Sequence, residues 1–220
     1  MTAPLKRRKP NQKRAQETRA RLLESAEELL SKEGFSSLTS RRLAKQADIS
    51  VGVIYDYFPS MQALMYWIYE VRLKKRVEIF DATMMGDNLE KPLKETFPAY
   101  LARMQTEHMW SQLDLELDNA AESDAKFGEL IAQFREELTD RFCAMFEARG
   151  SSLSKAELRR LAAYSHAVDH ASLRLQRNSN KDGKAFYGEL TTRVDLMLMQ
   201  RGGILDYEEV EELIELLVAD

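Results

Sequence analysis

The chain is poor in residues that cross-link a protein or interrupt its helices. Its 220 residues include a single cysteine, Cys143, with only 9 glycines and 5 prolines. One cysteine excludes an intrachain disulfide framework and favours a reducing, cytoplasmic location. Because glycine and proline are scarce and no segment sustains an alternation of polar and apolar residues, we predict an all-α protein.

Long apolar runs are missing as well. No stretch approaches the roughly 18 apolar residues of a membrane-spanning helix, so no membrane partner is expected. The basic residues near the N-terminus are not followed by an apolar segment, so a secretory signal peptide is not expected. Residues 1–11 are polar, basic and contain two prolines, a composition typical of a disordered arm.

Charge is divided unevenly along the chain. Residues 1–59 hold 12 Lys and Arg against 7 Asp and Glu, whereas the remaining residues hold 20 against 29. The formal net charge of −4 therefore combines a basic N-terminal region with an acidic remainder. This asymmetry favours a polyanionic partner at one end of the chain, although charge clustered at a solvated terminus would give the same counts.

Apolar periodicity predicts about 9–10 helices in two regions. Residues 12–59 are expected to form a small head, and residues 60–220 a helical bundle. After a first helix in the head, further helices are expected at 40–47, 51–57, 60–83, 90–121 (as one helix or two), 124–148, 154–177, 183–201 and 206–218. The last of these opens with Asp206 and Glu209, which have the spacing of a capping box.

Two short helices joined by a tight turn are the most informative part of the sequence. Thr39 and Ser50 precede them and can accept hydrogen bonds from their free backbone N–H groups. Ile54 and Phe58, one turn apart, are expected to anchor the second helix in the core. The outward face of that helix then consists of Val51, Gly52, Val53, Tyr55, Asp56 and Tyr57. Exposed tyrosines and valines suit a surface that meets a ligand, and the arrangement predicts a helix-turn-helix for the DNA major groove.

The residues around these helices form a specific combination of motifs. They are the Leu-Leu…Ala…Leu-Leu…Gly-Phe pattern over 22–35, Leu38-Thr39, Leu43-Ala44, Ala47-Asp48-Ile49-Ser50 and Ile54-Tyr55-Asp56-Tyr57-Phe58-Pro59-Ser60. Through them, the stretch from Arg21 to Leu64 resembles the N-terminal domain of the tetracycline-repressor (TetR) family of bacterial transcription regulators. The resemblance implies a homodimer with a helix-turn-helix head and a divergent bundle that binds a small effector.

The resemblance also implies which residues contact DNA. The expected phosphate contacts are Thr39, Ser50, Tyr55 and Tyr57, and the expected base-edge contacts are Val51, Gly52 and Val53, with Arg41 near the groove. Ser40 joins this set because backbone donors at a helix N-terminus can bind phosphate, and Arg42 because it adds positive charge. Three positions depart from the family pattern: Arg42 replaces a capping acid, Val53 a threonine and Met61 a lysine.

Two further sets of residues are assigned within the bundle. Large apolar groups and one acid are expected to line an effector pocket: Tyr66, Phe97, Tyr100, Met104, Trp110 and Asp114. Stripes at helical spacing are expected to form a four-helix dimer interface: Leu158, Leu161, Ala162, Ser165, Ser172, Phe186, Leu190, Val194 and Met197. His166 and His170, one turn apart around Asp169, have a spacing able to hold a metal, but a polar patch at the dimer contact is the simpler interpretation.

Sequence-specific binding to double-stranded DNA is the leading functional hypothesis. In its simplest form, a dimeric repressor leaves a palindromic operator when a small-molecule effector binds. The alternative is a TetR-like DNA binder that works without an effector, as an activator or architectural protein. A metal-dependent enzyme built on His166, Asp169 and His170 is a remote third interpretation. The leading hypothesis requires no enzymatic activity, no cofactor and no metal.

Overall fold

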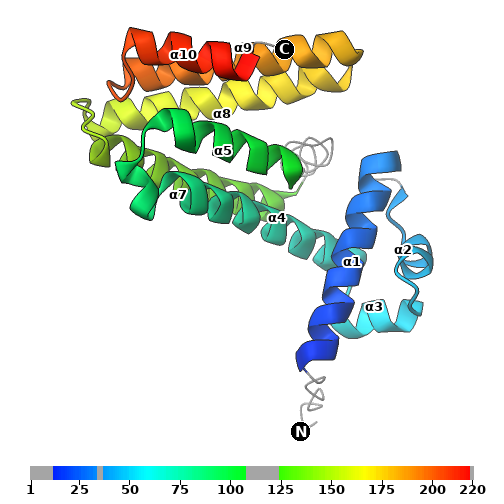
Figure 1. The fold of residues 1–220 in the computed structure, drawn as a ribbon. Helices are drawn as coiled ribbons and strands as arrows, with labels where there is room; N and C mark the ends of the chain where they lie inside the picture. The colour runs from blue at the N-terminus through cyan, green and yellow to red at the C-terminus, as the bar shows by residue number, and fades with distance from the viewer. Residues whose placement is uncertain (1–11, 34–36, 108–123, 219–220) are drawn as a thin grey trace, which may run out of the picture. The chain divides into compact units, whose positions relative to one another are not determined.

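Helices account for all the regular secondary structure in residues 12–33, 37–107 and 124–218, the parts that this computed structural model describes (Figure 1). The all-α fold with an N-terminal helix-turn-helix is therefore confirmed. The chain divides into two compact units, residues 1–68 and residues 69–220, and the boundary falls inside helix α4 (Met61–Met84). The division by role at residues 59 and 60 remains a prediction, and the proposed arm at residues 1–11 lies outside the described residues.

The first unit is built on helices α1 (Gln12–Glu33), α2 (Ser40–Gln46) and α3 (Val51–Tyr57). Its core consists of apolar side chains from all three helices and from the start of α4: Leu22, Ala26, Leu29, Leu30, Leu43, Ala44, Ala47, Ile54, Leu64 and Ile68. Small residues of α2, Ala44 and the C-cap Ala47, let that helix lie close to its neighbours. The core thereby fixes which face of α3 points outward.

The turn between α2 and α3 depends on an unusual backbone conformation. Asp48 has a positive φ of 50°, and it follows directly after the C-cap of α2. The N–H of Ile49 then donates to the carbonyl oxygen of Ala44 at 3.0 Å, which closes the helix end. Asparagine, aspartate and glycine tolerate this left-handed conformation, whereas β-branched residues do not.

Two substitutions at Asp48 should distinguish the effect of backbone strain on stability from the effect of losing the carboxylate. We expect Asp48→Val to lower the free energy of unfolding by about 1–2 kcal/mol, because a branched Cβ collides with the backbone in the left-handed region. Asp48→Gly removes the same carboxylate without adding strain, so it should leave stability unchanged or raise it. Urea unfolding of both variants provides the measurement, and equal stabilities would contradict the assignment of strain.

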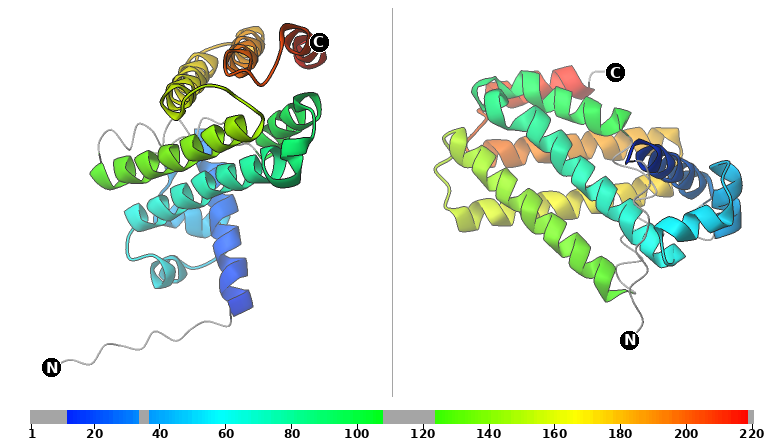
Figure 2. Two further views of the ribbon diagram at one scale, coloured as in Figure 1. Left: turned by 90° about the vertical axis from the view of Figure 1, so that its left-hand side faces the viewer. Right: turned by 90° about the horizontal axis from the view of Figure 1, so that it is seen from below.

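The second unit packs the rest of α4 with five more α-helices and a short 3₁₀ helix, η2 (Gly86–Glu90), in the described residues. The α-helices are α5 (Leu93–Thr106), α7 (Ala125–Ala148), α8 (Lys155–Arg177), α9 (Lys181–Arg201) and α10 (Tyr207–Val218). Helix α8 lies alongside α9, and α10 packs on α9 and on α5 (Figures 1 and 2). None of the described helices combines the length and apolarity that a membrane crossing would need.

Side-chain caps determine where several of these helices begin. The N–H of Ala63 donates to Ser60 Oγ at 3.1 Å near the start of α4. At α10, Asp206 and Glu209 exchange backbone-to-carboxylate hydrogen bonds of 2.9 Å, so the predicted capping box is confirmed. A second box, between Ser154 and Glu157, opens α8. Side chains within three residues of the first turn therefore determine where α4, α8 and α10 begin.

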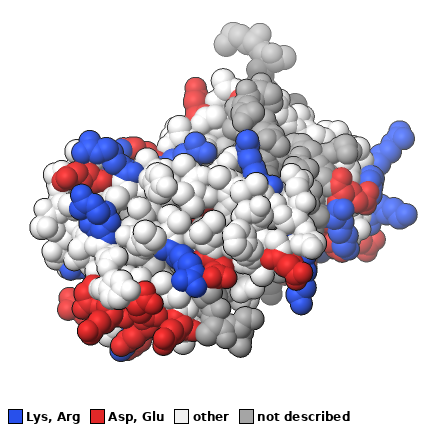
Figure 3. Space-filling model, turned by 90° about the horizontal axis from the view of Figure 1, so that it is seen from above, with Lys and Arg blue, Asp and Glu red and all other residues white. Residues whose placement is uncertain are grey.

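The surface of the second unit is strongly acidic over α10. Figure 3 shows acidic side chains gathered at one edge of the face seen from above. Helix α10 contributes a run of exposed glutamates, at positions 208, 209, 211, 212 and 215. A negatively charged surface repels a nucleic acid. A polyanionic partner is therefore expected only at the basic N-terminal region.

Candidate nucleic-acid interface and internal cavity

Helix α3 is divided sharply into an inner and an outer face. Ile54 is fully buried and Phe58, its C-cap, is 6% exposed, as the sequence pattern predicts. The ring of Phe58 lies 5.1 Å from the ring of Trp67, between centroids, which further fixes the end of the helix. Tyr55, on the opposite side, keeps 45% of its surface exposed. The geometry therefore presents one side of α3 to a partner.

The outer face of α3 combines apolar and hydrogen-bonding groups. Gly52 and Asp56 are exposed, and Val51, Val53 and Tyr57 are half-buried. The guanidinium of Arg19, on α1, lies 5.8 Å from the ring centroid of Tyr57, in the range of a cation–π contact. Tyr57 is thus held in place by α1, while its neighbour Tyr55 is the more accessible of the two tyrosines.

The hydroxyls that cap the two short helices retain the ability to donate. Thr39 Oγ1 accepts from the N–H of Arg42 at 3.3 Å, and Ser50 Oγ accepts from the N–H of Val53 at 3.4 Å. A hydroxyl that accepts one hydrogen bond still has its own proton to give. Both side chains are exposed, so they can cap a helix and donate to a phosphate oxygen together.

The two arginines at the start of α2 differ in their surroundings. Arg42 forms an ion pair with Glu33 of α1, and this hydrogen bond lowers the pKa of the Glu33 carboxyl. Gln46 Nε2, one turn further along, donates to Glu28 Oε2 at 2.6 Å. Arg42 therefore helps to brace α2 against α1, whereas Arg41 is exposed and forms no ion pair within the described residues. Arg41 is the better placed of the two for an anionic partner.

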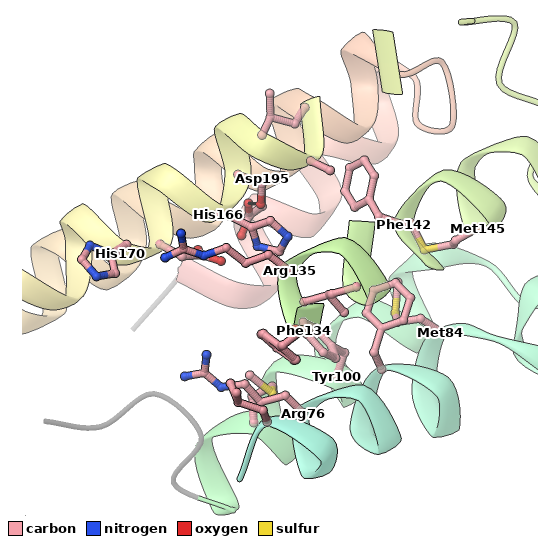
Figure 4. Close-up of a pocket in the computed structure, with 18 of the residues that line it drawn as sticks. Arg76, Met84, Tyr100, Phe134, Arg135, Phe142, Met145, His166, His170 and Asp195 are labelled. Atoms are coloured by element: carbon pink, nitrogen blue, oxygen red, sulfur yellow. Dashed lines mark hydrogen bonds between the residues drawn. The ribbon is translucent and has the colours of Figure 1, made fainter. Parts of the chain in front are cut away.

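The second unit contains a partly open cavity of about 140 Å³ (Figure 4). Most of its wall is apolar, and the aromatic and sulfur-containing side chains that line it are Phe80, Met84, Phe97, Tyr100, Met104, Phe134, Phe142, Met145 and Met199. Phe97, Tyr100 and Met104 are among the residues expected to line a pocket. Tyr66 lies outside this lining and belongs to the first unit, and Trp110 and Asp114 lie outside the described residues.

One part of the cavity wall carries ionisable groups that the sequence analysis did not bring together. They come from four helices and are Arg76, Arg135, His166, Asp169, His170 and Asp195. Figure 4 shows His166 and Asp195 close together, with the Arg135 side chain extending past them. Ser165 Oγ donates to Asp195 Oδ1 at 3.0 Å, and this bond joins α8 to α9. His166, Asp169 and His170, which the sequence analysis places in a polar patch, thus line this cavity. Their position at a dimer contact remains a prediction.

Burial displaces the pKa values of these groups in opposite directions. It raises the pKa of Asp169 to about 7, against a partial opposing effect of Arg76. It also raises the pKa of Asp195, and the nearby charge of Asp169 adds to this increase. Burial, with the positive charges of Arg135 and Arg76, lowers the pKa of His166 to about 4. At neutral pH His166 is therefore neutral, and its buried Nε2 has no hydrogen-bond partner among the described residues.

Metal binding receives no geometric support from this region. His166, Asp169 and His170 share one helix, but the described residues contain no cluster of three or more His, Cys, Asp or Glu arranged to hold a metal ion. Cys143 is buried, as expected, and burial raises the pKa of its thiol, which makes it a poor nucleophile.

Comparison with known proteins agrees with the geometry of the first unit. Residues 22–66 match the model of bacterial regulatory proteins of the tetR family. This segment belongs to the tetR family. No curated protein sequence matches it. The matched segment contains α2, α3 and most of α1, so the family of DNA-binding transcription regulators is assigned through the helix-turn-helix.

Solved structures of other regulators share the fold of this one. A TetR transcriptional regulator from Legionella pneumophila is 19% identical, covering 82% of this chain and 95% of that chain, with a TM-score of 0.66. GusR from Salmonella enterica is 21% identical, covering 86% and 95%, with a TM-score of 0.61. A TetR regulator from Haloarcula marismortui is 14% identical, covering 90% and 98%, with a TM-score of 0.64. At these identities the likeness concerns the fold.

The regulator exposes two apolar stripes on α8 and α9. On α8, Tyr164 and Leu175 are 57% and 48% exposed, and on α9, Phe186, Leu190 and Met197 are 59%, 48% and 61% exposed. The members of each stripe lie four, seven or eleven residues apart, so each stripe follows one side of its helix. Large exposed apolar groups in this density are typical of a surface that another protein covers.

The α8 part of the predicted dimer interface needs correction. Leu158 and Ala162 are buried in the core of the protomer, and Leu161 packs against that core. Ser172 Oγ donates to the carbonyl oxygen of Tyr187 at 3.2 Å, and Ser165 is hydrogen-bonded to Asp195. These small and apolar residues form the contact between α8 and α9 within one chain. The exposed stripe lies on the other side of α8.

Proposed function

We propose that this regulator is a homodimeric repressor that leaves a palindromic operator when a small molecule enters the cavity of the second unit. The proposal rests on one observation. The chain has an outward-facing helix-turn-helix in one unit and an aromatic-lined cavity of about 140 Å³ in the other. An effector-independent DNA binder would have no use for a cavity with buried ionisable groups in its wall.

In this proposal, the residues that contact DNA are those that the helix-turn-helix leaves accessible to solvent. Thr39, Ser50, Tyr55 and Tyr57 would donate to phosphates, and Ser40 would offer backbone N–H groups at the start of α2. Val51, Gly52 and Val53 would face base edges, where valines can only make apolar contact. Arg41 would approach a phosphate or a base, while Arg42 would act mainly through its ion pair with Glu33.

Effector release in this proposal acts through α4. Leu73, Arg76, Phe80 and Met84 of this helix line the cavity, and its first residues belong to the core of the first unit. A shift of α4 on binding would therefore reach both units through one continuous helix. Weakening of DNA binding by about 100-fold needs only about 2.7 kcal/mol of coupling, and DNA must weaken effector binding by the same factor.

Two linked experiments test the proposed function. Selection from a random pool of duplex DNA should yield a palindrome whose half-sites lie about 34–36 Å apart, one turn of DNA, for two recognition helices. A compound library should then contain molecules that release the selected DNA in a mobility-shift assay. Selection of no palindrome would refute the repressor model at its first step, and a palindrome that no compound releases would refute effector control.

The valines of α3 predict a preference for thymine. A thymine methyl buried against Val51 or Val53 contributes about 0.8 kcal/mol, so replacing two such thymines by uracil should weaken binding by about tenfold. The Val51→Ala, Val53→Ala double variant should lose most of this discrimination while it still binds DNA. Competition between thymine and uracil duplexes measures both values. Equal affinity of the native regulator for the two duplexes would refute the predicted methyl contacts.

A further inference from the structure

The outer face of α3 carries no positive charge of its own. The helix reads Val-Gly-Val-Ile-Tyr-Asp-Tyr, so the charge that it exposes at neutral pH is the negative one of Asp56. No lysine or arginine occurs in residues 46–71, a stretch that also includes the first turns of α4. A DNA backbone would therefore meet a negative charge on α3 and would displace no counterions by contact with it. A cation at this face has to come from another part of the chain.

Arg19 of α1 brings a cation to the end of α3. The central carbon of its guanidinium lies 5.8 Å from the ring centroid of Tyr57, the last residue of α3. At this distance the positive group is attracted to the face of the ring. Arg19 is exposed, and its side chain forms no ion pair or hydrogen bond with any residue that the structure describes. The contact with Tyr57 therefore holds a full positive charge at the edge of α3 without neutralising it.

Other cations of the first unit are already paired with acids. Arg42 of α2 pairs with Glu33, and Lys32 of α1 pairs with Glu28. A carboxylate at ion-pair distance cancels much of the attraction that such a cation exerts on a phosphate. Arg19 differs from them because its neighbour is an aromatic ring, which attracts the guanidinium but carries no net charge.

The contact with Tyr57 also leaves the hydrogen-bond donors of Arg19 available. A guanidinium has five N–H donors in a planar fork, and its attraction to a ring face uses none of them. The fork matches the oxygens of a phosphate, which it can bind through two parallel hydrogen bonds. A side chain that is already held in place loses less conformational freedom when it binds. The ring of Tyr57 thus suits Arg19 for binding an anion.

We propose that Arg19 is a phosphate contact of the DNA interface and that the ring of Tyr57 positions it. This inference rests on the proposed function, because it adds a contact to the same interface. It also divides the role of Tyr57 between two groups: the hydroxyl would act on DNA directly, whereas the ring acts through Arg19. Helix α1 then contacts the duplex together with α2 and α3.

The salt dependence of DNA binding distinguishes a phosphate contact from a purely structural one. Binding of the full chain to a labelled duplex of mixed sequence serves as the assay, because phosphate contacts are independent of sequence. Arg19→Gln should flatten the plot of log affinity against log salt by about 0.9 for each bound protomer. At about 0.1 M salt it should weaken binding by about tenfold for each protomer, since the counterion release of one contact is lost.

Arg21→Gln is the matched control for this variant. Arg21 is also exposed and lies on the same helix, but two residues along α1 correspond to a rotation of about 200° around its axis. The control removes the same charge from the other side of α1. It should leave the salt slope within about 0.2 of the native value, because only cations at the interface release counterions.

Two substitutions at Tyr57 distinguish the role of the ring from that of the hydroxyl. Tyr57→Phe keeps the ring face, so it should keep the native salt slope even where loss of the hydroxyl weakens binding. Tyr57→Leu removes the ring and should flatten the slope by at least roughly half as much as Arg19→Gln does. Adding Arg19→Gln to Tyr57→Leu should then change the slope by less than about 0.5 for each protomer, because the two residues act together. Circular dichroism checks that each variant folds.

Each contrary result identifies the step that is wrong. An Arg19→Gln slope equal to the native one, or an Arg21→Gln slope that is flattened equally, would refute the phosphate contact and leave DNA binding itself intact. A native slope in Tyr57→Leu, or a slope flattened equally in Tyr57→Phe, would refute positioning by the ring. If Tyr57→Leu does not fold, the exposed Arg19 and Arg21 variants still decide the contact. A native chain without affinity for duplex DNA would refute the proposed function together with this contact.

Discussion

Replacing Phe186 and Leu190 with aspartate should make the regulator monomeric and weaken its affinity for a palindromic operator by about a hundredfold or more. These side chains are 59% and 48% exposed on one side of α9, so aspartate there disturbs little within the protomer. Across a two-fold interface each substitution occurs twice, and buried carboxylates would face each other or apolar groups. Because a palindrome is bound by two heads at once, a monomer loses the second half-site completely.

Analytical ultracentrifugation and mobility-shift titration measure the two effects. Leu216→Asp is the matched control, because Leu216 is 63% exposed on α10, outside the α8 and α9 stripes. The control should remain dimeric and keep its operator affinity. If it became monomeric while the α9 variant remained a dimer, the interface would belong to α10. Circular dichroism should show unchanged helix content in both proteins, which separates loss of association from loss of folding.

The helix-turn-helix was predictable because short-range chemistry specifies it. Ile54 and Phe58 lie one turn apart and are buried, and Thr39 and Ser50 cap the two helices they precede. Each of these signals involves residues within four positions of one another, so no knowledge of the remaining chain is needed. Helix boundaries in the bundle were predictable for the same reason, as the Asp206 and Glu209 box shows.

The cavity could not be predicted in the same way. Its ionisable groups belong to α4, α7, α8 and α9, and nothing near Asp195 in sequence marks it as a partner of Asp169. Their proximity depends on how four helices pack, which apolar periodicity does not determine. A weak signal existed, because Ser165, His166, Asp169 and His170 place polar groups on a helix side that also carries Leu158 and Ala162. Such a mixture is typical of a helix that lines a polar cavity.

The assignment of the protomer-core residues Leu158 and Ala162 to the dimer contact has a related cause. This helix has apolar residues on two sides, one facing α9 and the core, the other facing solvent. Small residues such as Ala162 and Ser172 indicate that another helix approaches closely, but they do not say whether that helix belongs to the same chain. On α9 the predicted residues Phe186, Leu190 and Met197 are exposed, because its inner side is formed by Leu196 and Met199 instead. Their role at a dimer interface remains a prediction.

Asp169→Asn should raise the free energy of unfolding at pH 8 by about 2–4 kcal/mol, since each pKa unit corresponds to about 1.4 kcal/mol. Burial raises the pKa of Asp169 from 3.8 to about 7 in the folded protein. Between these values the folded state holds a proton that the unfolded state has lost, so stability falls as pH rises. An asparagine has no proton to lose. The variant and the native chain should therefore be equally stable near pH 4 and diverge up to pH 8.

Urea unfolding at a fixed protomer concentration, repeated from pH 4 to pH 8, measures this divergence. Asp87→Asn should follow the native curve within about 0.5 kcal/mol at every pH, because Asp87 is exposed. A native stability that rises from pH 5 to pH 8, or an Asp169→Asn variant less stable at pH 8, would show that Asp169 is ionised and well paired in the free protein. The higher stability expected of Asp169→Asn at pH 8 would show that the fold itself gains nothing from this carboxyl group.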